Sequence, residues 1–300
     1  MTTTTADLRT IPDPAEPVPK IARPTLLLIV AGWLVFVAST AFALTGAWPM
    51  IVSVPFSTAA SFVLFTVAHE ASHNTISSHH WVNTWLGRLA IPLFAPHACF
   101  GAWRYIHMQH HRFTNEDGQD PDHYTHRGAP WTRPLRWITV DLQYIPFYLR
   151  VIRKRPRAEL IELVVTLTIM IAIGITIVET GYGVELLVLY FLPLRLSILM
   201  LGWAFDYLPH HDLTATPTDD RYQATRNRIG LEHILTPLLL YQNYHLVHHL
   251  HPRIPFYRYI AVWRRNEDEY LAQDPALSDA RGRPLTTEEY RRLRALQEHH

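Results

Sequence analysis

The sequence predicts an all-α integral membrane protein, with four transmembrane helices in two hairpins and a histidine-rich helical cap on the cytoplasmic side. Three observations lead to this prediction. Four apolar runs are each about long enough to cross some 30 Å of hydrocarbon as a helix. The 19 histidines gather beyond the ends of those runs. Lysine and arginine concentrate between and after the two hairpins, and none occurs at either hairpin tip.

The apolar runs occur as two pairs. Residues 25–46 and 50–68 contain no charged side chain and are separated only by Ala-Trp-Pro. Residues 159–178 and 186–205 form the second pair, and glycines in the short connector between them favour a turn. Arg195 interrupts the last run, and it has two interpretations: an ion pair inside the protein, or a side chain that reaches the membrane surface.

The distribution of basic residues predicts the orientation of the chain in the membrane. Residues 150–157 read Arg-Val-Ile-Arg-Lys-Arg-Pro-Arg. Because cytoplasmic loops are enriched in lysine and arginine, both hairpin tips are expected outside. The sequence therefore predicts a multi-pass protein of the cell (inner) membrane, with residues 69–158 and both termini in the cytoplasm.

The remaining segments complete the expected domain organisation. Residues 1–23 are rich in threonine and proline, which predicts a disordered N-terminal tail. Residues 24–270 are expected to form the membrane domain, and residues 271–300 a polar C-terminal tail. Residues 81–100 are apolar but contain Arg88 and two prolines, which favours a re-entrant or interfacial helix.

The composition excludes several classes of protein. A hydrophobic content of 48% is too high for wholesale disorder. A single cysteine excludes a disulfide scaffold, a cysteine-rich zinc site and a cysteine-ligated iron–sulfur cluster. The net charge of +1 gives no electrostatic indication of a nucleic-acid partner.

Three histidine boxes have the spacing of metal ligands on helices. They read His-Glu-Ala-Ser-His, His-Met-Gln-His-His and His-Leu-Val-His-His. Spacings of three and four residues place imidazoles on one helix face. Neutral imidazole binds iron, zinc and copper well. The candidate ligands are His69, His73, His107, His110, His111, His245, His248 and His249. Eight imidazoles exceed the needs of one tetrahedral ion, which implies two metal ions.

Two other classes of function compete for this pattern. The first box also matches the zinc metallopeptidase motif, with Glu70 as the general base. That interpretation leaves the other two boxes unexplained. A metal carrier is the third class, but transporters usually place their ligands within the spans near the bilayer midplane.

The three boxes, in this order between two membrane hairpins, resemble those of the membrane fatty acid desaturase and hydroxylase superfamily over residues 25–265. The resemblance implies a mushroom-like helical fold and a cytoplasmic di-iron centre. Such a centre uses O₂ as co-substrate and two electrons supplied from outside. The family also uses a lone histidine after the last span, often four residues after an amide. His210 matches it, with Asp206 in place of the amide, and His211 is the alternative.

Two segments resemble the carotenoid-oxidising branch of this superfamily, the desaturase-like β-carotene hydroxylases and ketolases. They are Asp-Pro-Asp-His-Tyr at 120–124 and the extended third box at 243–257. This resemblance implies hydroxylation of a β-carotene-type lipid, with a fatty acyl desaturase as the alternative. In a metal-bound histidine, the ring nitrogen that does not bind the metal usually has a hydrogen-bond partner. Candidates for this supporting role are Asp122, Asp206 and His211. Six other histidines are interpreted as supporting, surface or structural groups: His79, His80, His97, His123, His126 and His233.

The electrons must come from another protein. The sequence contains no haem-binding His-Pro-Gly-Gly, no paired CxxC and no GxGxxG motif. We therefore expect a ferredoxin-like donor with its reductase. Basic residues that offer it a docking surface lie at 150–157 and at Arg253, Arg258, Arg264 and Arg265. Anionic lipid headgroups explain these arginines equally well.

Overall fold

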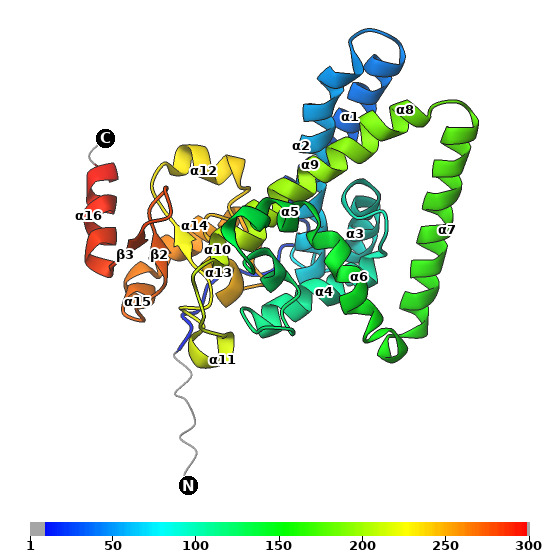
Figure 1. Cartoon of the computed structure of the whole chain (residues 1–300). Coiled ribbons are helices and arrows are strands. Elements are labelled where there is room, and N and C mark those ends of the chain that lie inside the picture. The colour runs from blue at the N-terminus through cyan, green and yellow to red at the C-terminus, as the bar shows by residue number, and fades with distance from the viewer. Residues whose placement is uncertain (1–9, 299–300) are drawn as a thin grey trace. The chain divides into compact units, whose positions relative to one another are not determined.

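The computed structural model describes residues 10–298 and divides the chain into two compact units, each considered by itself. The span unit comprises residues 19–108 and 127–203. The C-terminal unit comprises, among the described residues, 10–18, 109–126 and 204–298. Figure 1 labels the elements of both.

The regular elements of the span unit are all helices among its described residues. Its helices are α1 (Arg23–Leu44), α2 (Met50–His73), α3 (His80–Phe94), α5 (Arg133–Ile138), α6 (Val140–Leu149), α7 (Arg157–Glu179), α8 (Gly183–Leu186) and α9 (Leu192–Leu201). Helix α4 (Phe100–Phe113) begins in this unit and ends in the other.

The C-terminal unit combines short helices with a small sheet. Its helices are α10 (Leu208–His210), α11 (Pro217–Asp220), α12 (Glu232–Leu238), α13 (His245–Leu250), α14 (Tyr259–Arg265), α15 (Glu267–Leu271) and α16 (Thr287–Glu298). Strand β1 (Asn227–Arg228) pairs in parallel with β2 (Leu277–Ser278), and β2 pairs antiparallel with β3 (Pro284–Leu285).

The four predicted spans are confirmed as helices long and apolar enough to cross a membrane. The first and third are α1 and α7, and the fourth runs over Gly183–His210 through two π-helical turns, Leu187–Phe191 and Gly202–Tyr207. Helix α2 and the fourth span both extend beyond their apolar runs. Because a helix does not have to end where its apolar run ends, these extensions carry histidines past the spans.

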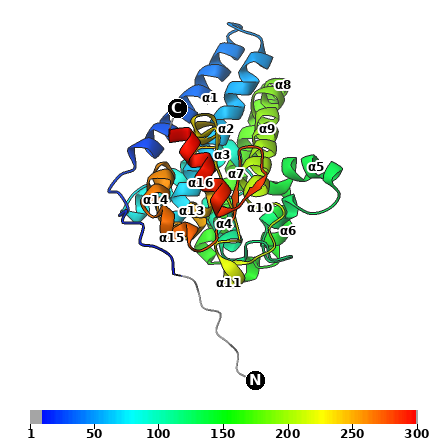
Figure 2. The ribbon, with the colours of Figure 1, turned by 90° about the vertical axis from the view of Figure 1, so that its left-hand side faces the viewer.

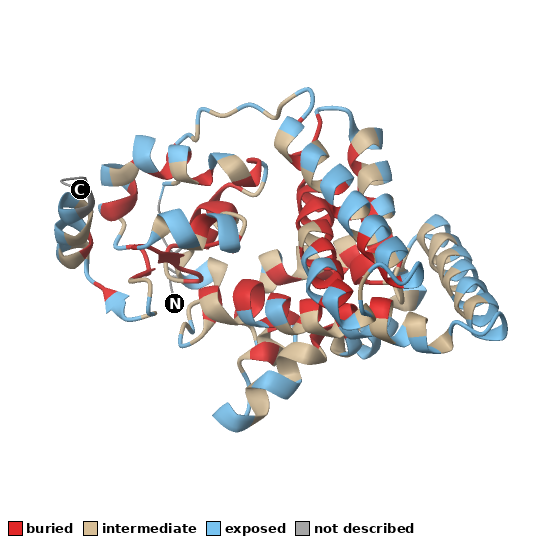
Figure 3. Ribbon diagram, turned by 90° about the horizontal axis from the view of Figure 1, so that it is seen from above, coloured by how far each residue is buried: buried red, intermediate tan, exposed pale blue. Residues whose placement is uncertain are grey.

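The first hairpin is closely packed, whereas α7 is mostly exposed. At Gly32 in α1, an added Cβ would lie 3.0 Å from the side chain of Leu64 in α2. At the tip, the Trp48 indole donates to the hydroxyl of Ser53, which donates to the carbonyl of Ser39. In contrast, α7 contains no buried residue (Figure 3). Its first turns contact the span unit through Leu160, Leu163 and the Arg88–Glu162 ion pair. Because most of its apolar side chains remain exposed, the rest of the helix is suited to contact with lipid.

The structure also answers two questions that the sequence left open in the span unit: the form of residues 81–100 and the role of Arg195. Helix α3 ends at Phe94, short of the predicted segment 81–100, and packs against α2. Arg195 forms a bidentate ion pair with the buried carboxylate of Asp141. The ion-pair interpretation of this arginine is therefore the correct one.

Both predicted tails differ from the expectation within the described residues. The hydroxyl of Tyr222 donates to the carbonyl of Thr10, and Arg265 pairs with Glu16. Residues 1–9 lie outside the described part of the chain. At the other end, Tyr290 of α16 is fully buried and accepts a hydrogen bond from Trp263 of α14. Figure 2 shows α14, α15 and α16 side by side.

Candidate metal centre

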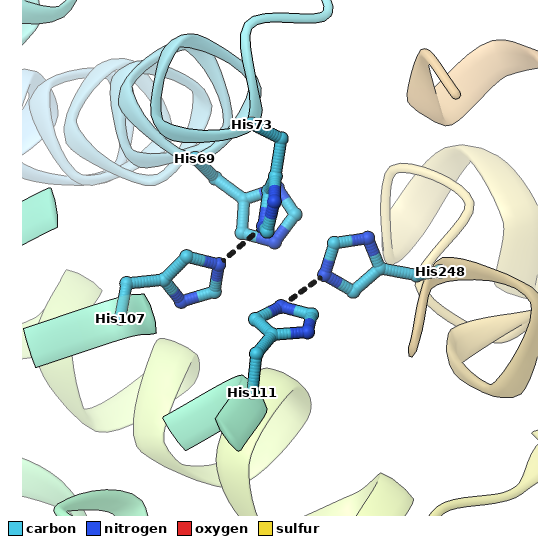
Figure 4. A group of neighbouring side chains, drawn as sticks. All are labelled: His69, His73, His107, His111 and His248. Carbon is cyan, nitrogen blue, oxygen red and sulfur yellow. Dashed lines mark hydrogen bonds between the residues drawn. The ribbon is translucent and has the colours of Figure 1, made fainter. Parts of the chain in front are cut away.

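Three histidines of the span unit turn their rings toward one another (Figure 4). His69 and His73 lie one turn apart on α2, and His107 lies on α4. The Nε2 atoms of His73 and His107 are 2.7 Å apart. The ring centroids of His69 and His107 are 4.6 Å apart. The spacing of the first box therefore places two imidazoles on one helix face, and the second box adds a third.

Aromatic side chains hold this triad in place. The ring of Phe65 stacks on His69, and Trp103 stacks almost parallel on His107 with the centroids 5.4 Å apart. Phe94 packs edge-on against both Phe65 and Trp103. These rings fix the planes of two imidazoles and exclude water from one side of the triad.

The acidic residue of the first box is fully buried. The hydroxyl of Thr75 donates to Glu70 Oε2 at 2.7 Å. The Nδ1 atom of His69 lies 3.7 Å from Glu70 Oε1. A metallopeptidase base must instead reach a water molecule on the metal. In this structure Glu70 lies on the outer side of the His69 ring, at Nδ1.

A second group of histidines lies entirely within the C-terminal unit. It consists of His110, His210, His245 and His249, which offer ligand atoms that all lie within 4.8 Å of one another. The Nε2 atom of His249 lies 3.1 Å from that of His245 and 3.3 Å from that of His110. All but the half-buried His249 are buried. Residues more than a hundred positions apart thus supply one cluster.

A histidine pair in the same unit accompanies this group. The Nε2 atoms of His111 and His248 are 2.9 Å apart, as the dashed line in Figure 4 marks. The rings of His111 and His249 stack with centroids 4.3 Å apart. Helix α13 therefore presents its three box histidines toward the end of α4.

The outer ring nitrogens have protein partners. His110 Nδ1 lies 2.9 Å from Asp120 Oδ1, and His210 Nδ1 lies 3.3 Å from the Ala224 carbonyl. His245 Nδ1 lies 2.6 Å from Gln242 Oε1, and His248 Nδ1 lies 2.9 Å from the Tyr259 hydroxyl. Carboxylate, amide and carbonyl oxygens accept the Nδ1 proton, so Nε2 presents its lone pair to the interior. Histidines that bind metals through Nε2 usually have this arrangement.

The donor set fits a transition metal. The Nε2 atom of His210 is buried and makes no hydrogen bond with any described residue. Burial, and then the nearby imidazole of His111, lower the pKa of His249 well below its usual range. Neutral imidazoles with lone pairs facing inward are suitable ligands for a divalent transition metal.

His110 has the opposite charge preference. Burial alone would lower its pKa, but the carboxylates of Asp120 and Asp122 outweigh burial and raise the pKa to about 9. Without a metal ion, these two carboxylates therefore favour the protonated imidazole of His110. A metal ion at Nε2 would replace one proton and leave the Nδ1 hydrogen bond in place.

Comparison with known proteins agrees with this architecture. The family model described as fatty acid desaturase matches residues 46–280. The chain belongs to the fatty acid desaturase family. It is 30% identical to a β-carotene ketolase of a Paracoccus species, over 77% of this chain and 87% of that protein. It is 28% identical to the dihydrorhizobitoxine desaturase of Bradyrhizobium elkanii, over 65% of this chain and 61% of that protein.

A shorter match extends the range of relatives. The chain is 34% identical to an sn-1 oleoyl-lipid 12-desaturase of a Picosynechococcus species, over 29% of this chain and only 24% of that protein. Family membership identifies the protein as a metal-dependent, membrane-associated oxidoreductase. This excludes the zinc metallopeptidase and metal-carrier interpretations. The ketolase relatives support the predicted resemblance to the carotenoid-oxidising branch.

All nine histidines predicted as ligands in this desaturase-family protein lie in the triad, the group of four or the pair. Their role as ligands stays a prediction. His210 belongs to the group of four, whereas His211 stacks on Tyr207 with its Nδ1 near backbone carbonyls. The geometry therefore favours His210. Asp206 belongs to none of the groups found among the described residues, and its carbonyl accepts a hydrogen bond from His126.

The structure also shows supporting residues that the sequence analysis missed. Asp120, which holds His110 Nδ1 by a hydrogen bond, was not predicted, whereas the predicted Asp122 lies 3.4 Å from the same nitrogen. Gln242 and Tyr259 were not predicted either. For Gln242, the position three residues before His245 was an available signal; for Tyr259, no local pattern was available.

The other histidines divide into contacts and surface groups. His126 stacks on His210 with ring centroids 6.0 Å apart, so it lies behind a predicted ligand. His123 lies near Asp117, and His97 lies 3.8 Å from Asp141. The structural interpretation of His97 agrees with this contact.

Proposed function

We propose that this protein is a membrane di-iron oxygenase that uses O₂ and two external electrons to hydroxylate a carotenoid of the β-carotene type. The histidine groups are the observation that carries the proposal, because they offer nine imidazoles and no thiolate. The relatives named β-carotene ketolase support the choice of substrate. The substrate is apolar and is expected to enter from the bilayer.

Two iron ions held by the nine histidines would supply the redox chemistry for cleaving an unactivated C–H bond, which no side chain can perform. The chain's own residues position those ligands and keep the site dry. Asp120, Gln242 and Tyr259 hold outer ring nitrogens, so that Nε2 faces the metal. Phe65 and Trp103 stack on ligand rings and exclude water beside the span-unit triad.

A fatty acyl desaturase is the second candidate function. The match to an oleoyl-lipid desaturase and to other lipid desaturases supports it. Hydroxylation and desaturation begin with the same C–H bond cleavage, so small differences in substrate position decide between them. The two candidates differ in substrate and therefore in the product that an experiment detects.

Expression in a carotene-accumulating host separates the two candidates. Pigments and fatty acids are both extracted and analysed by mass spectrometry. Oxygenated carotenoid supports the proposal, and new acyl double bonds with unchanged carotene support the alternative. The controls are His110→Ala, which should abolish either product, and His233→Ala at an exposed histidine, which should not. Neither product from an iron-loaded protein supplied with electrons would contradict both.

We further propose an acidic ferredoxin-like donor, with its reductase, that docks on Arg253 and Arg264. Both side chains are exposed, whereas Arg258 and Arg265 already lie close to Glu16. Reversing the two exposed charges should slow electron transfer and weaken its dependence on salt. The protein is proposed to lie in the cell (inner) membrane with both termini cytoplasmic, as its basic segments predict.

A further inference from the structure

The loop after α4 fixes one carboxylate with three donors. Asp120 is 5% exposed. Its Oδ1 accepts hydrogen bonds from His110 Nδ1 and from the backbone N–H of Asp122, each at 2.9 Å. Its Oδ2 accepts the backbone N–H of Asn115 at 2.8 Å. A carboxylate held by three donors cannot rotate away from the imidazole without losing at least one of them.

The same loop is anchored to the rest of the C-terminal unit. Asn115 adopts a left-handed conformation with φ of 67°. Its side-chain amide donates to the carbonyls of Ala215 and Ala224, each at 2.8 Å. The Ala224 carbonyl also accepts from His210 Nδ1. The loop that carries Asp120 is therefore positioned by the chain segment that also positions a second histidine of the group.

Asp120 differs in charge from the other outer partners. His210 donates to a carbonyl and His245 to an amide oxygen, both neutral. At His110 the hydrogen-bond partner of Nδ1 is instead a carboxylate. A hydrogen bond to an ionised acceptor is shorter and roughly twice as strong as a neutral one. It also pushes electron density toward Nε2, which makes the imidazole a stronger metal ligand.

We propose that Asp120 is the positioning residue that aims His110 Nε2 into the group of four and sets the affinity and redox potential of the iron bound there. The inference rests on the proposed di-iron function. It assigns the dominant support to Asp120, not to its neighbour Asp122, whose carboxylate lies 3.4 Å from the same nitrogen. A negative charge at this position favours the more oxidised iron.

Asp120→Asn tests the proposal in the purified full-length protein, with Fe²⁺ as the probe and a chelator in competition. Replacing an outer partner of this kind typically weakens metal binding about 10- to 100-fold. We expect a loss in this range at one of two iron sites, together with a higher midpoint potential. Asp122→Asn should have a smaller effect, and Asp117→Asn, in the same loop but 62% exposed, should have none.

Gln242→Glu makes the opposite change, because it adds a carboxylate where Asp120→Asn removes one. It keeps the proposal testable if Asp120→Asn fails to fold. It places a carboxylate on His245 Nδ1, and the amide nitrogen that it replaces has no hydrogen-bond partner among the described residues. We expect tighter iron binding and a lower midpoint potential. Thermal unfolding of the metal-free variants shows whether either change acts only on stability.

The outcomes separate the two proposals. Wild-type protein that binds no iron would contradict the di-iron function itself. Wild-type protein that binds two irons, with unchanged affinity and potential in Asp120→Asn, would overturn the role of Asp120 alone. A potential that moves in the same direction in Asp120→Asn and Gln242→Glu would also overturn it.

Discussion

Replacing Gly202 by alanine should destabilise the fourth span where it turns toward His210. Gly202 begins the π-helical turn Gly202–Tyr207, and an added Cβ would lie 2.8 Å from both the Cα and the carbonyl oxygen of Trp137 in α5. Ordinary contact begins at 3.4 Å, so backbone would have to move by about 0.6 Å in a closely packed interior. Overpacking of this kind costs about 1–3 kcal/mol.

Gly174 offers a matched control for this substitution. It lies inside α7, and an added Cβ there would meet no atom within 4 Å. Gly174→Ala should therefore leave stability unchanged or raise it by up to about 1 kcal/mol, since alanine favours the helix. Thermal unfolding in detergent, with the iron content measured in parallel, compares the variants. Equal unfolding midpoints for Gly202→Ala and Gly174→Ala would refute the packing argument.

Three further predictions concern single side chains. His210→Ala should lose about one of two irons on metal analysis, because its imidazole belongs to the group of four, whereas His211→Ala should retain both. Equal loss of iron in the two variants would contradict the choice of His210 over His211. Tyr259→Phe should weaken iron binding about tenfold in chelator competition, as it removes the partner of a ligand's Nδ1; unchanged affinity would oppose it. Burial raises the pKa of the Cys99 thiol to about 11. N-ethylmaleimide should therefore label the native protein very slowly at pH 8 and faster as the pH rises, but should label the denatured protein readily. Rapid labelling of the native protein at pH 8 would contradict the buried position.

The sequence determined the membrane helices and histidine groups well, because both depend on local spacing. An apolar run of the right length needs no partner to be recognised, and i, i+4 spacing places His69 and His73 on one face wherever the helix packs. His210 was chosen only through a resemblance, and its place in the group of four favours that choice while its role as a ligand stays a prediction. The fold, and not the local sequence, brings His210 into this group and leaves His211 beside the carbonyls of Tyr207 and Leu208.

The contacts that the sequence did not reveal join distant or chemically equivalent residues. Asp120 and Asp122 are both acidic and two positions apart, and only the loop conformation decides which one reaches His110. The partner of Arg195 is Asp141, on another helix.

The C-terminal segment looked polar because its large apolar residues are few and do not follow a helical or strand period. Leu277, Leu285 and Tyr290 are nevertheless all buried in the C-terminal unit.

Metal analysis of the purified full-length protein tests the central claim most directly. The account predicts about two irons per chain. Replacing His110 by alanine should remove about one of them and abolish oxygen-dependent oxidation of carotene. A single zinc per chain, with no iron and no redox activity after iron loading, would contradict it.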